Sequence, residues 1–401
     1  MNIVLICGIF IYVCRDEAAE EAKSLNIGLI GFGSMGRTHA YAVQNLKYFY
    51  RDLPFDARIS GICCAHRENA AAAAKAFSLG KVYERDIDMI NDPDIDIIDI
   101  CTPNIYHYET LKAAIAAGKH IYCEKPLCTA ADEAFEIASL AKKKGIVGAV
   151  VFNTRFLLPV MRAAELVRAG RIGDVLSFSS KFFHSSVADP NHPAGWKQDR
   201  DICGGGVLFD LGSHAIDLVR MLCGEFESVS GLSQIAYPER IGTDGKMWRT
   251  NADEAFYITA KLRCGACGTV SVGKIMQGTN DDHSFEIYGS RGSIKFDLMD
   301  PNFLYFYDAE APESERGFTR IECCGRYPEP SGIFPGKKAP VGWLRGHVGS
   351  MYSFLDCVYR NAEPSPSFED AAAVQLIMEK AYESDRRGGV RTEICQRETK
   401  L

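Results

Sequence analysis

The sequence predicts an α/β fold, with an N-terminal doubly wound parallel sheet followed by an α+β domain that has an open, mostly antiparallel sheet. Two observations carry this prediction. From residue 26 to residue 153, continuous apolar runs alternate with helical segments, which is typical of a parallel sheet covered on both faces. After residue 153 the apolar residues alternate singly with polar ones between glycine turns, which is typical of antiparallel strands. With 401 residues, the chain is long enough for two cores.

The elements of the first part follow one another in a regular order. The stretch "NIGLIGFGSMGRTHAYAVQNL" predicts a strand, a glycine turn and a helix. Further strands are expected at "ARISGICC", "IDIIDICTP", "KHIYCEKP" and "IVGAVVFN", with helices at "RENAAAAAKAF", "IYHYETLKAAIAAG" and "TAADEAFEIASLAKKKG" and a short helix in "KVYERDIDMIND". We therefore place a nucleotide-binding domain at 26–153.

The second part has longer alternating segments, so we expect an α+β domain at 154–401 for substrate binding and oligomerisation. Its strands are predicted at "VLSFSSKFFHSS", "EFESVSGLSQIAY", "EAFYITAKLR", "GTVSVGKIMQ" and "HSFEIYGSRGSIKFD". The amphipathic stretch "FEDAAAVQLIMEKAYESDRR" predicts the last helix. We interpret Cys264-Gly265-Ala266-Cys267, between two such strands, as a hairpin turn rather than a metal or redox site, because a zinc site needs a second pair of ligands.

Composition narrows the class of protein. The chain is 47% hydrophobic and 24% charged, and its formal net charge of -7 comes without a large basic cluster. This predicts a globular protein that binds a small molecule and no nucleic acid. The 15 cysteines show no disulfide-scaffold spacing and favour reduced thiols in the cytoplasm. Nothing in the cysteine and histidine spacing predicts a metal.

Residues 1–25 stand apart from the rest as an N-terminal extension. The apolar run "NIVLICGIFIYVC" has no basic residue before its apolar core, no small-residue cleavage site after it, and too few residues to span a bilayer. We interpret these residues as an extension or as sequence upstream of the natural start, and expect no membrane association.

The first chemically informative motif is Gly31-Phe32-Gly33-Ser34-Met35-Gly36, which follows a predicted strand and opens a predicted helix. In this context the glycines let the backbone turn tightly beside a pyrophosphate, and the helix N-terminus offers N–H groups. The motif predicts a Rossmann dinucleotide site.

The ribose-binding position leaves the choice of dinucleotide open. At the end of the second strand stand Ala65, His66 and Arg67, with no carboxylate for a ribose 2'-hydroxyl. Arg67 either meets a 2'-phosphate or is a solvated helix residue, so NAD is expected and NADP is not excluded. At the end of the next central strand, Thr102, Pro103 and Asn104 are expected over the cofactor, and His107 near it.

The whole pattern resembles one enzyme family. A Rossmann glycine turn, "TPNIYH", Glu-Lys-Pro at a strand end and "GGGVLFDLGSHAIDLV" resemble the Gfo/Idh/MocA oxidoreductases, from about residue 26 to residue 387. The resemblance implies that Lys125, Asp210 and His214 are the catalytic residues.

These residues also suit the chemistry of alcohol oxidation. A histidine near neutral pKa, His214, can take the hydroxyl proton, Lys125 can polarise the oxygen, and Asp210 can orient the group. Glu124 is expected to fix the charge of Lys125 or the nicotinamide amide. Asn153 is a further candidate for the cofactor. Arg155 and Trp196, together with the catalytic residues, are candidates for the substrate; the alternatives are that Arg155 pins the contact between the domains and that Trp196 packs in a core or interface.

We therefore expect an NAD(P)-dependent oxidoreductase that moves a hydride between nicotinamide and a secondary hydroxyl of a pyranose sugar, glycoside or cyclitol. The family resemblance favours C3 of a glucosyl unit. Two alternatives stay open: an NAD-dependent glycosidase that oxidises its substrate only transiently, and a non-catalytic sugar-sensing regulator. The resemblance also implies a homodimer or homotetramer, and some relatives retain their cofactor tightly.

Overall fold

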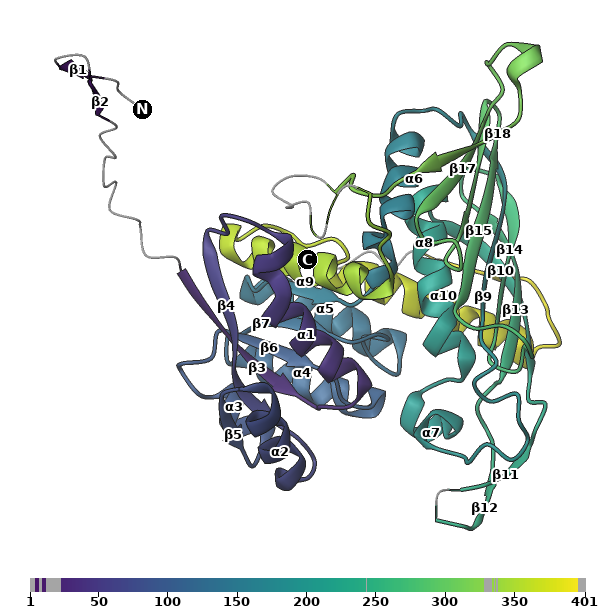
Figure 1. The fold of residues 1–401 in the computed structure, drawn as a ribbon. Helices are drawn as coiled ribbons and strands as arrows, with labels where there is room; N and C mark the ends of the chain where they lie inside the picture. The colour runs from purple at the N-terminus through teal and green to yellow at the C-terminus, as the bar shows by residue number, and fades with distance from the viewer. Residues whose placement is uncertain are drawn as a thin grey trace.

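The computed structural model describes residues 4–6, 9–11, 23–242, 244–327, 334, 336 and 338–395. Most of the predicted N-terminal extension lies outside these residues. Within it, β1 (Val4–Ile6) and β2 (Ile9–Ile11) pair antiparallel, apart from the two domains (Figure 1). The first domain begins slightly earlier than expected, because its first strand starts at Lys23.

The first domain is a six-stranded sheet in the order β5-β4-β3-β6-β7-β8, and every pair in it is parallel. Its central strands are mostly apolar because helices cover both faces and bury both sets of side chains, with the buried Asp99 on β6 as an exception. The predicted doubly wound sheet is confirmed. The elements are β3 (Lys23–Ile30), α1 (Ser34–Phe49), β4 (Phe55–Cys63), α2 (Arg67–Phe77), β5 (Lys81–Tyr83), α3 (Asp86–Ile90), β6 (Ile97–Ile100), α4 (His107–Ala116), β7 (His120–Cys123), α5 (Ala131–Lys144) and β8 (Gly148–Val150).

The second domain is a nine-stranded sheet in the order β18-β17-β16-β15-β9-β14-β13-β10-β19. Only the β14–β9 pair is parallel, so the predicted open, mostly antiparallel sheet is confirmed. Residues 264–267 lie at the β13–β14 hairpin, so the predicted hairpin turn is confirmed. Gly265 in this turn has φ +93°. The strands are β9 (Val175–Phe183), β10 (Phe226–Gln234), β13 (Ala255–Leu262), β14 (Cys267–Gly273), β15 (Asp282–Gly289), β16 (Gly292–Asp297), β17 (Phe303–Asp308), β18 (Phe318–Glu322) and β19 (Thr392–Glu393); β11 (Glu239–Ile241) and β12 (Met247–Arg249) form a separate hairpin.

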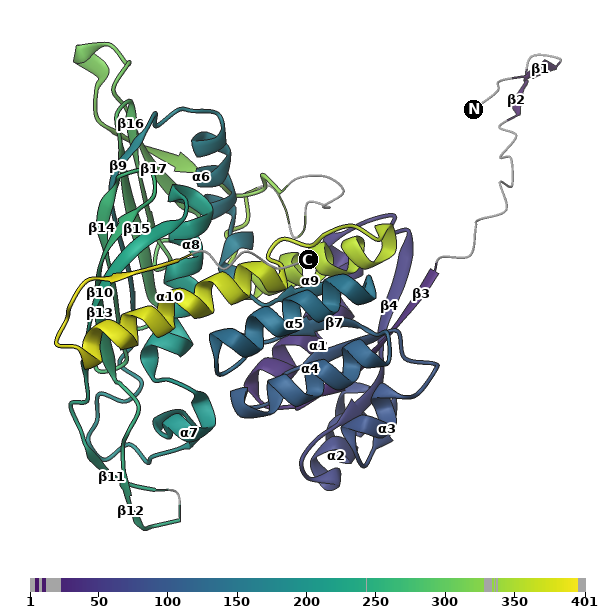
Figure 2. The same cartoon turned by 180° about the vertical axis from the view of Figure 1, so that it is seen from behind.

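Helices cover one face of this sheet (Figures 1 and 2). They are α6 (Leu158–Arg168), α8 (Ser213–Cys223) and α10 (Phe368–Arg386), and the last of these is the predicted amphipathic helix. Helix α10 also packs against α5, so it links the two domains. The short helix α7 (Arg200–Cys203) lies near the start of α8 in sequence.

The predicted boundary at residue 154 is incomplete, because the chain later returns to the first domain. Helix α9 (Trp343–Arg360) packs on α1 and places Val348, Phe354 and Leu355 in the core beneath β3 and β4. The Tyr122 hydroxyl on β7 donates to Ser350 Oγ on α9 at 2.7 Å. Part of the predicted second domain therefore completes the first.

One segment, Arg200–Cys223, has the length and apolarity of a membrane span. In the structure, 83% of its most apolar window is buried inside the protein. Its apolar character is explained by its place in the core, where α8 packs against β9 and α10.

Candidate active site

A cleft of about 1970 Å³ lies between the two domains and is lined by both. The first domain contributes the carboxyl ends of its parallel strands, which is where doubly wound folds bind their ligands. The second contributes α8 and the loops around it. The predicted residues on its wall are Gly31, Phe32, Gly33, Ser34, Met35, Ala65, Thr102, Pro103, Asn104, Glu124, Lys125, Asn153, Trp196, Asp210 and His214.

The glycine turn forms one end of this cleft. Gly31 has φ +91°, and a Cβ there would lie 2.7 Å from the Cys101 carbonyl oxygen, so only glycine fits. A Cβ on Gly33 would meet no described atom within 4 Å, because its backbone faces the open cleft. Helix α1 begins directly afterwards without a side-chain cap, leaving N–H groups for an anion. Gly36 is not on the wall: a Cβ there would lie 2.2 Å from the Gly31 oxygen, so it permits close packing of α1 on the turn.

Buried polar atoms on the wall fit a dinucleotide. Thr102 Oγ1, Asn153 Nδ2 and Thr154 Oγ1 have no hydrogen-bond partner among the described residues, and all three residues line the cleft. A bound polar ligand would satisfy such atoms. Together with the glycine turn, they match the needs of a nicotinamide dinucleotide.

His107 does not reach the cleft, contrary to our expectation. Its ring is fully buried, with Nδ1 3.0 Å from the Pro126 oxygen and Nε2 3.0 Å from the Thr102 oxygen. It therefore joins the loops that follow β6 and β7 instead of touching the cofactor.

The expected ribose contacts are only partly on the wall. Ala65 and the following Asn69 line the cleft, but His66 and Arg67 do not. The Arg67 Nε lies 3.3 Å from Glu84 Oε1, and both side chains are exposed. Glu84, which follows β5, does line the cleft. The carboxylate at this end of the cleft is thus Glu84, which follows β5, whereas we expected the ribose contacts to follow β4.

Glu-Lys-Pro directly follows β7, which ends at Cys123. Glu124 is buried and Lys125 is partly exposed, and both line the cleft. The Lys125–Pro126 peptide bond is cis. These charges are tolerated because each has a partner: Glu124 Oε2 accepts from the Lys125 backbone N–H at 3.2 Å, and the Lys125 ammonium donates to Asp210.

Asp210 is surrounded by the ammonium groups of three lysines, Lys125, Lys197 and Lys274. We call these four residues together the lysine cluster. Lys125 Nζ donates to Asp210 Oδ1 at 2.7 Å and to its carbonyl oxygen at 2.8 Å. Lys197 and Lys274 reach Oδ2 at 2.9 Å and 2.5 Å. Lys125 comes from the first domain and the other two from the second, so the cluster joins the domains across the cleft.

Burial and these charges set the protonation of the site. Burial alone would raise the pKa of Asp210, but Lys125, Lys197 and Lys274 outweigh it and hold that pKa well below its ordinary value. Burial, and then the Lys125 ammonium, lower the pKa of His214 well below its ordinary value. Burial also lowers the pKa of Lys274, although Asp210 opposes this. At neutral pH the site therefore pairs an ionised Asp210 with a neutral His214, whose pKa is lower than the near-neutral value that we expected.

Asp210 lies just outside the regular α-helix that carries His214. Leu208–Gly212 form a π-helical turn, and α8 begins at Ser213. The buried carboxylate of Asp253 fixes this turn by accepting from the Gly206 and Leu208 N–H groups, each at 3.0 Å. Both Asp210 and His214 face the cleft, but Asp210 orients Lys125, and His214 Nδ1 has no partner among the described residues.

Arg155 is not a substrate residue in this structure, which corrects our expectation. Its buried guanidinium donates to Asp217 Oδ2 at 2.7 Å and to Asp370 Oδ2 at 3.1 Å, and it does not line the cleft. It connects the short helix after β8 with α8 and α10. Trp196 does lie on the wall, where it is 37% exposed.

Sequence reasoning missed several wall residues. Lys274 follows β14, and only the fold brings it to Asp210. Lys197 was noted beside Trp196, but its contact with Asp210 was not expected. Trp343 and His347 come from α9, whose return to the first domain was not predicted. His184 and Asp281, 2.9 Å apart, line the substrate-domain side. For Lys197 the sequence did carry a signal, because this residue stands beside Trp196 in the loop before the glycine run.

Comparisons with known proteins identify the family. Residues 25–152 match the profile described as "Oxidoreductase family, NAD-binding Rossmann fold", and residues 160–295 match the "GFO/IDH/MocA C-terminal domain". Levoglucosan dehydrogenase of Pseudarthrobacter phenanthrenivorans is 33% identical over 375 residues, which cover 90% of this chain and 96% of that protein. The chain belongs to the Gfo/Idh/MocA family.

Other relatives and solved structures agree with this assignment. Myo-inositol 2-dehydrogenase of Thermotoga maritima is 26% identical, covering 73% of this chain and 81% of that enzyme. The structure of "Levoglucosan dehydrogenase, complex with NADH and levoglucosan" superimposes with a TM-score of 0.90 at 32% identity, covering 93% of this chain and 100% of that one. This chain is thus an NAD-dependent oxidoreductase of a family that acts on sugar and cyclitol hydroxyl groups.

Proposed function

We propose that this enzyme oxidises a secondary hydroxyl of a pyranose sugar, anhydrosugar or glycoside, with C3 of a glucosyl unit as the favoured position. The observation that carries the oxidation of a hydroxyl is the lysine cluster next to a neutral His214, in a cleft shared with the glycine turn. The choice of C3 rests on the family resemblance alone. The similarity to levoglucosan dehydrogenase supports the substrate class.

In the proposed mechanism, His214 accepts the hydroxyl proton. A neutral imidazole at neutral pH has a free nitrogen for this, and burial together with Lys125 keeps it neutral. Lys125 donates a hydrogen bond to the same substrate oxygen and thereby stabilises negative charge that develops there. Asp210 holds the Lys125 ammonium in position at 2.7 Å. Nicotinamide, when bound, supplies the hydride acceptor.

The lysine cluster has a surplus of positive charge, since three ammonium groups surround one carboxylate. Such a surplus stabilises an oxygen that becomes negative as its proton leaves. It does not require an anionic substrate, because the charge develops during the reaction.

Two tryptophans line the cleft, Trp196 and Trp343. Indole faces pack well on the C–H faces of sugar rings and leave the hydroxyl groups to polar side chains. This favours a ring-shaped carbohydrate over a linear alcohol. Trp248 lies in β12 and is not on the cleft wall.

The experiment is a screen of the purified enzyme with NAD against levoglucosan, methyl glucosides, glucose and myo-inositol, followed by nicotinamide absorbance. We expect reduction of NAD with at least one of them, and a keto product whose carbon is assigned by NMR. Net hydrolysis of a glycoside without net NAD reduction would instead support the glycosidase. Binding of a sugar without turnover would support the sensor.

We also propose that the enzyme is a cytoplasmic homo-oligomer. Every cysteine in the described part of the chain is free, which suits a reducing compartment. The face of the second sheet opposite the helices has a row of residues on neighbouring strands, the exposed Thr259, Thr269 and Ser179 and the half-buried Glu286, suited to contact a second copy. Light scattering on a sizing column would distinguish a monomer from a dimer or tetramer. The same purified sample, denatured, would reveal a retained cofactor and whether it is NAD or NADP.

A further inference from the structure

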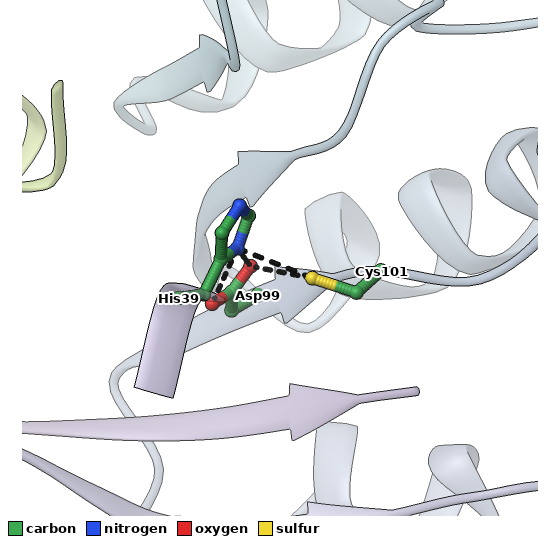
Figure 3. Close-up of side chains that lie close together, drawn as sticks. All are labelled: His39, Asp99 and Cys101. Carbon is green, nitrogen blue, oxygen red and sulfur yellow. Dashed lines mark hydrogen bonds and ion pairs between the residues drawn. The ribbon is translucent and has the colours of Figure 1, made fainter. Parts of the chain in front are cut away.

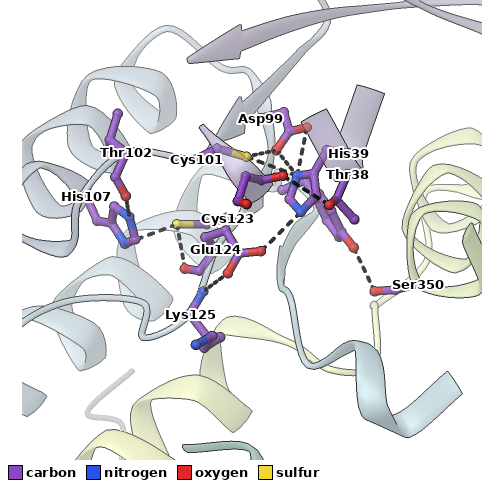
Figure 4. Close-up of polar contacts among 12 residues, drawn as sticks. Thr38, His39, Asp99, Cys101, Thr102, His107, Cys123, Glu124, Lys125 and Ser350 are labelled. Carbon is purple, nitrogen blue, oxygen red and sulfur yellow. Dashed lines mark hydrogen bonds and ion pairs between the residues drawn. The ribbon is translucent and has the colours of Figure 1, made fainter. Parts of the chain in front are cut away.

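Behind the cleft wall lies a buried group that the mechanism above does not use. His39 of α1 is 1% exposed and sits between two carboxylates, Asp99 of β6 and Glu124 after β7. Its Nδ1 is 2.9 Å from Asp99 Oδ1, and its Nε2 is 3.1 Å from Glu124 Oε1 (Figures 3 and 4). We call these three residues the His39 network.

The geometry indicates which protonation state His39 has. A neutral imidazole has one N–H, so it can donate to only one of the two carboxylates, whereas an imidazolium donates to both. Two carboxylates on one ring therefore favour the charged form, with two charge-assisted hydrogen bonds. Burial alone would lower the pKa of His39, but the charge and hydrogen bond of Asp99 hold it well above its ordinary value.

Cys101 completes the neighbourhood but does not make it a metal site. Its Sγ lies 3.1 Å from His39 Nδ1, and His39, Asp99 and Cys101 could in principle ligate an ion (Figure 3). Nδ1 already faces Asp99, and burial raises the pKa of the Cys101 thiol, which disfavours the thiolate that a metal needs. We interpret the contact as a hydrogen bond to a neutral thiol.

The His39 network leads directly to the active site. Glu124 Oε1 accepts from His39, and its Oε2 accepts from the Lys125 backbone N–H at 3.2 Å (Figure 4). Lys125 in turn donates to Asp210. Glu124 lines the cleft while His39 and Asp99 do not, so the network supports the wall from behind.

We propose that His39 is a positioning residue, an imidazolium that keeps Glu124 ionised and oriented at the end of β7 and thereby aims Lys125 at Asp210. This inference rests on the proposed function only where it predicts changes in kcat and KM. The structural part, a doubly protonated ring shared by two carboxylates, stands without any substrate.

Other titratable groups around the network are neutral or already paired. Burial raises the pKa of Tyr122, Cys123 and Cys101 and lowers the pKa of His107 and His347, so these groups carry no charge at neutral pH. The charged groups that face Glu124 are His39, Lys125 and Lys197. Burial alone would raise the pKa of Glu124; the hydrogen bond and charge of His39 are the largest opposing effects and keep it lowered.

The first test is ¹⁵N NMR of the cofactor-free protein with labelled histidine. We expect both His39 nitrogens to show imidazolium shifts across neutral pH, and in Glu124→Gln we expect them to begin titrating there, because one carboxylate is lost. A neutral ring in the native protein, or no change in Glu124→Gln, would overturn the proposal. This readout is independent of turnover, so failure of the proposed substrate class leaves it intact.

The second test is the pH dependence of kcat/KM in His39→Gln. We expect kcat to fall about ten- to a hundredfold, because a charged hydrogen bond is lost, with KM for the sugar changing less. Without His39, burial raises the pKa of Glu124, so this carboxylate becomes protonated at a higher pH. On acidification, His39→Gln should therefore lose activity at a higher pH than the native enzyme does. The double variant His39→Gln/Glu124→Gln has no carboxylate at position 124, so the part of this shift that comes from Glu124 should vanish.

The matched control is His120→Gln, at the start of the same strand β7, where Nδ1 accepts from the Val147 N–H at 3.0 Å. We expect it to retain the native pH profile. The same acid shift in the control or in the double variant would show that His39 acts only through general stability. Should His39→Gln fail to fold, the NMR of the native protein and of Glu124→Gln decides the matter.

Discussion

The lysine cluster and the His39 network are opposite solutions to the problem of burying charge. Around Asp210, three ammonium groups share one carboxylate, whereas around His39 two carboxylates share one imidazole. The first has a positive surplus and faces the cleft. The second has a negative surplus and lies mostly behind the wall. The contrast indicates that the reacting side is built to stabilise negative charge, and the supporting side to hold a cation in place.

Lys125 belongs to both groups, because its backbone N–H meets Glu124 and its ammonium meets Asp210. Removing it should give the largest effect on activity. For Lys125→Met we expect kcat/KM to fall by about 10²–10³-fold, as for the loss of one hydrogen-bond donor to an oxygen that becomes negative during the reaction. Steady-state kinetics on NAD reduction measures this. Lys47→Met, at an exposed pair with Asp56, is the matched control and should remain near native.

A third charged group, away from the cleft, separates stability from catalysis. Arg155 is buried with Asp217, and Arg155→Met leaves that carboxylate without its main partner. We expect a loss of about 3–5 kcal/mol in the free energy of unfolding, measured by denaturant titration. Arg162→Met, at an exposed pair with Glu165, should change it by only about 0–1 kcal/mol. Equal effects of the two changes would mean that Arg155 does not pin the domain junction.

Lys274 tests whether the positive surplus matters beyond Lys125. In Lys274→Met, Asp210 keeps Lys125 and Lys197, so the carboxylate remains ionised, but one buried ammonium is lost. We expect kcat to fall about ten- to a hundredfold, the effect of one charge-assisted hydrogen bond, with NAD affinity unchanged. Kinetics and calorimetry of NAD binding would separate the two. A kcat of Lys274→Met equal to that of the native enzyme would show that Lys274 has only a packing role in the second domain.

The smallest effect is expected at the exposed end of the cofactor site. Arg67 is neutralised by Glu84 and does not line the cleft, so Arg67→Ala should change the preference for NAD over NADP by less than about tenfold. Comparing kcat/KM for the two cofactors measures this. A large gain or loss of NADP activity would place Arg67 at the 2'-position after all.

The sequence predicted the two domains and most of the cleft because those features depend on local pattern. Apolar runs, the glycine turn and Glu-Lys-Pro each have a local signature, and Lys125, Asp210 and His214 do line one cleft. Lys274 and His39 have no such signature. A lysine after a strand and a histidine in a helix become informative only when the fold sets them beside Asp210 and Glu124. Arg155 was wrongly placed for the same reason, because its partner Asp217 is remote in sequence, and His107 because its ring turns to the backbone oxygens of the two neighbouring loops.

The central claim is that burial, and after it the Lys125 ammonium, keeps His214 neutral, so that it can take the proton. The most direct measurement is an NMR titration of the His214 ring in the native protein and in Lys125→Met. Burial and Lys125 both lower its pKa, so the native ring should remain neutral well below the ordinary range. Removal of Lys125 should raise that pKa. A native His214 that is protonated at neutral pH, or a His214 pKa that is the same in Lys125→Met as in the native protein, would contradict the account.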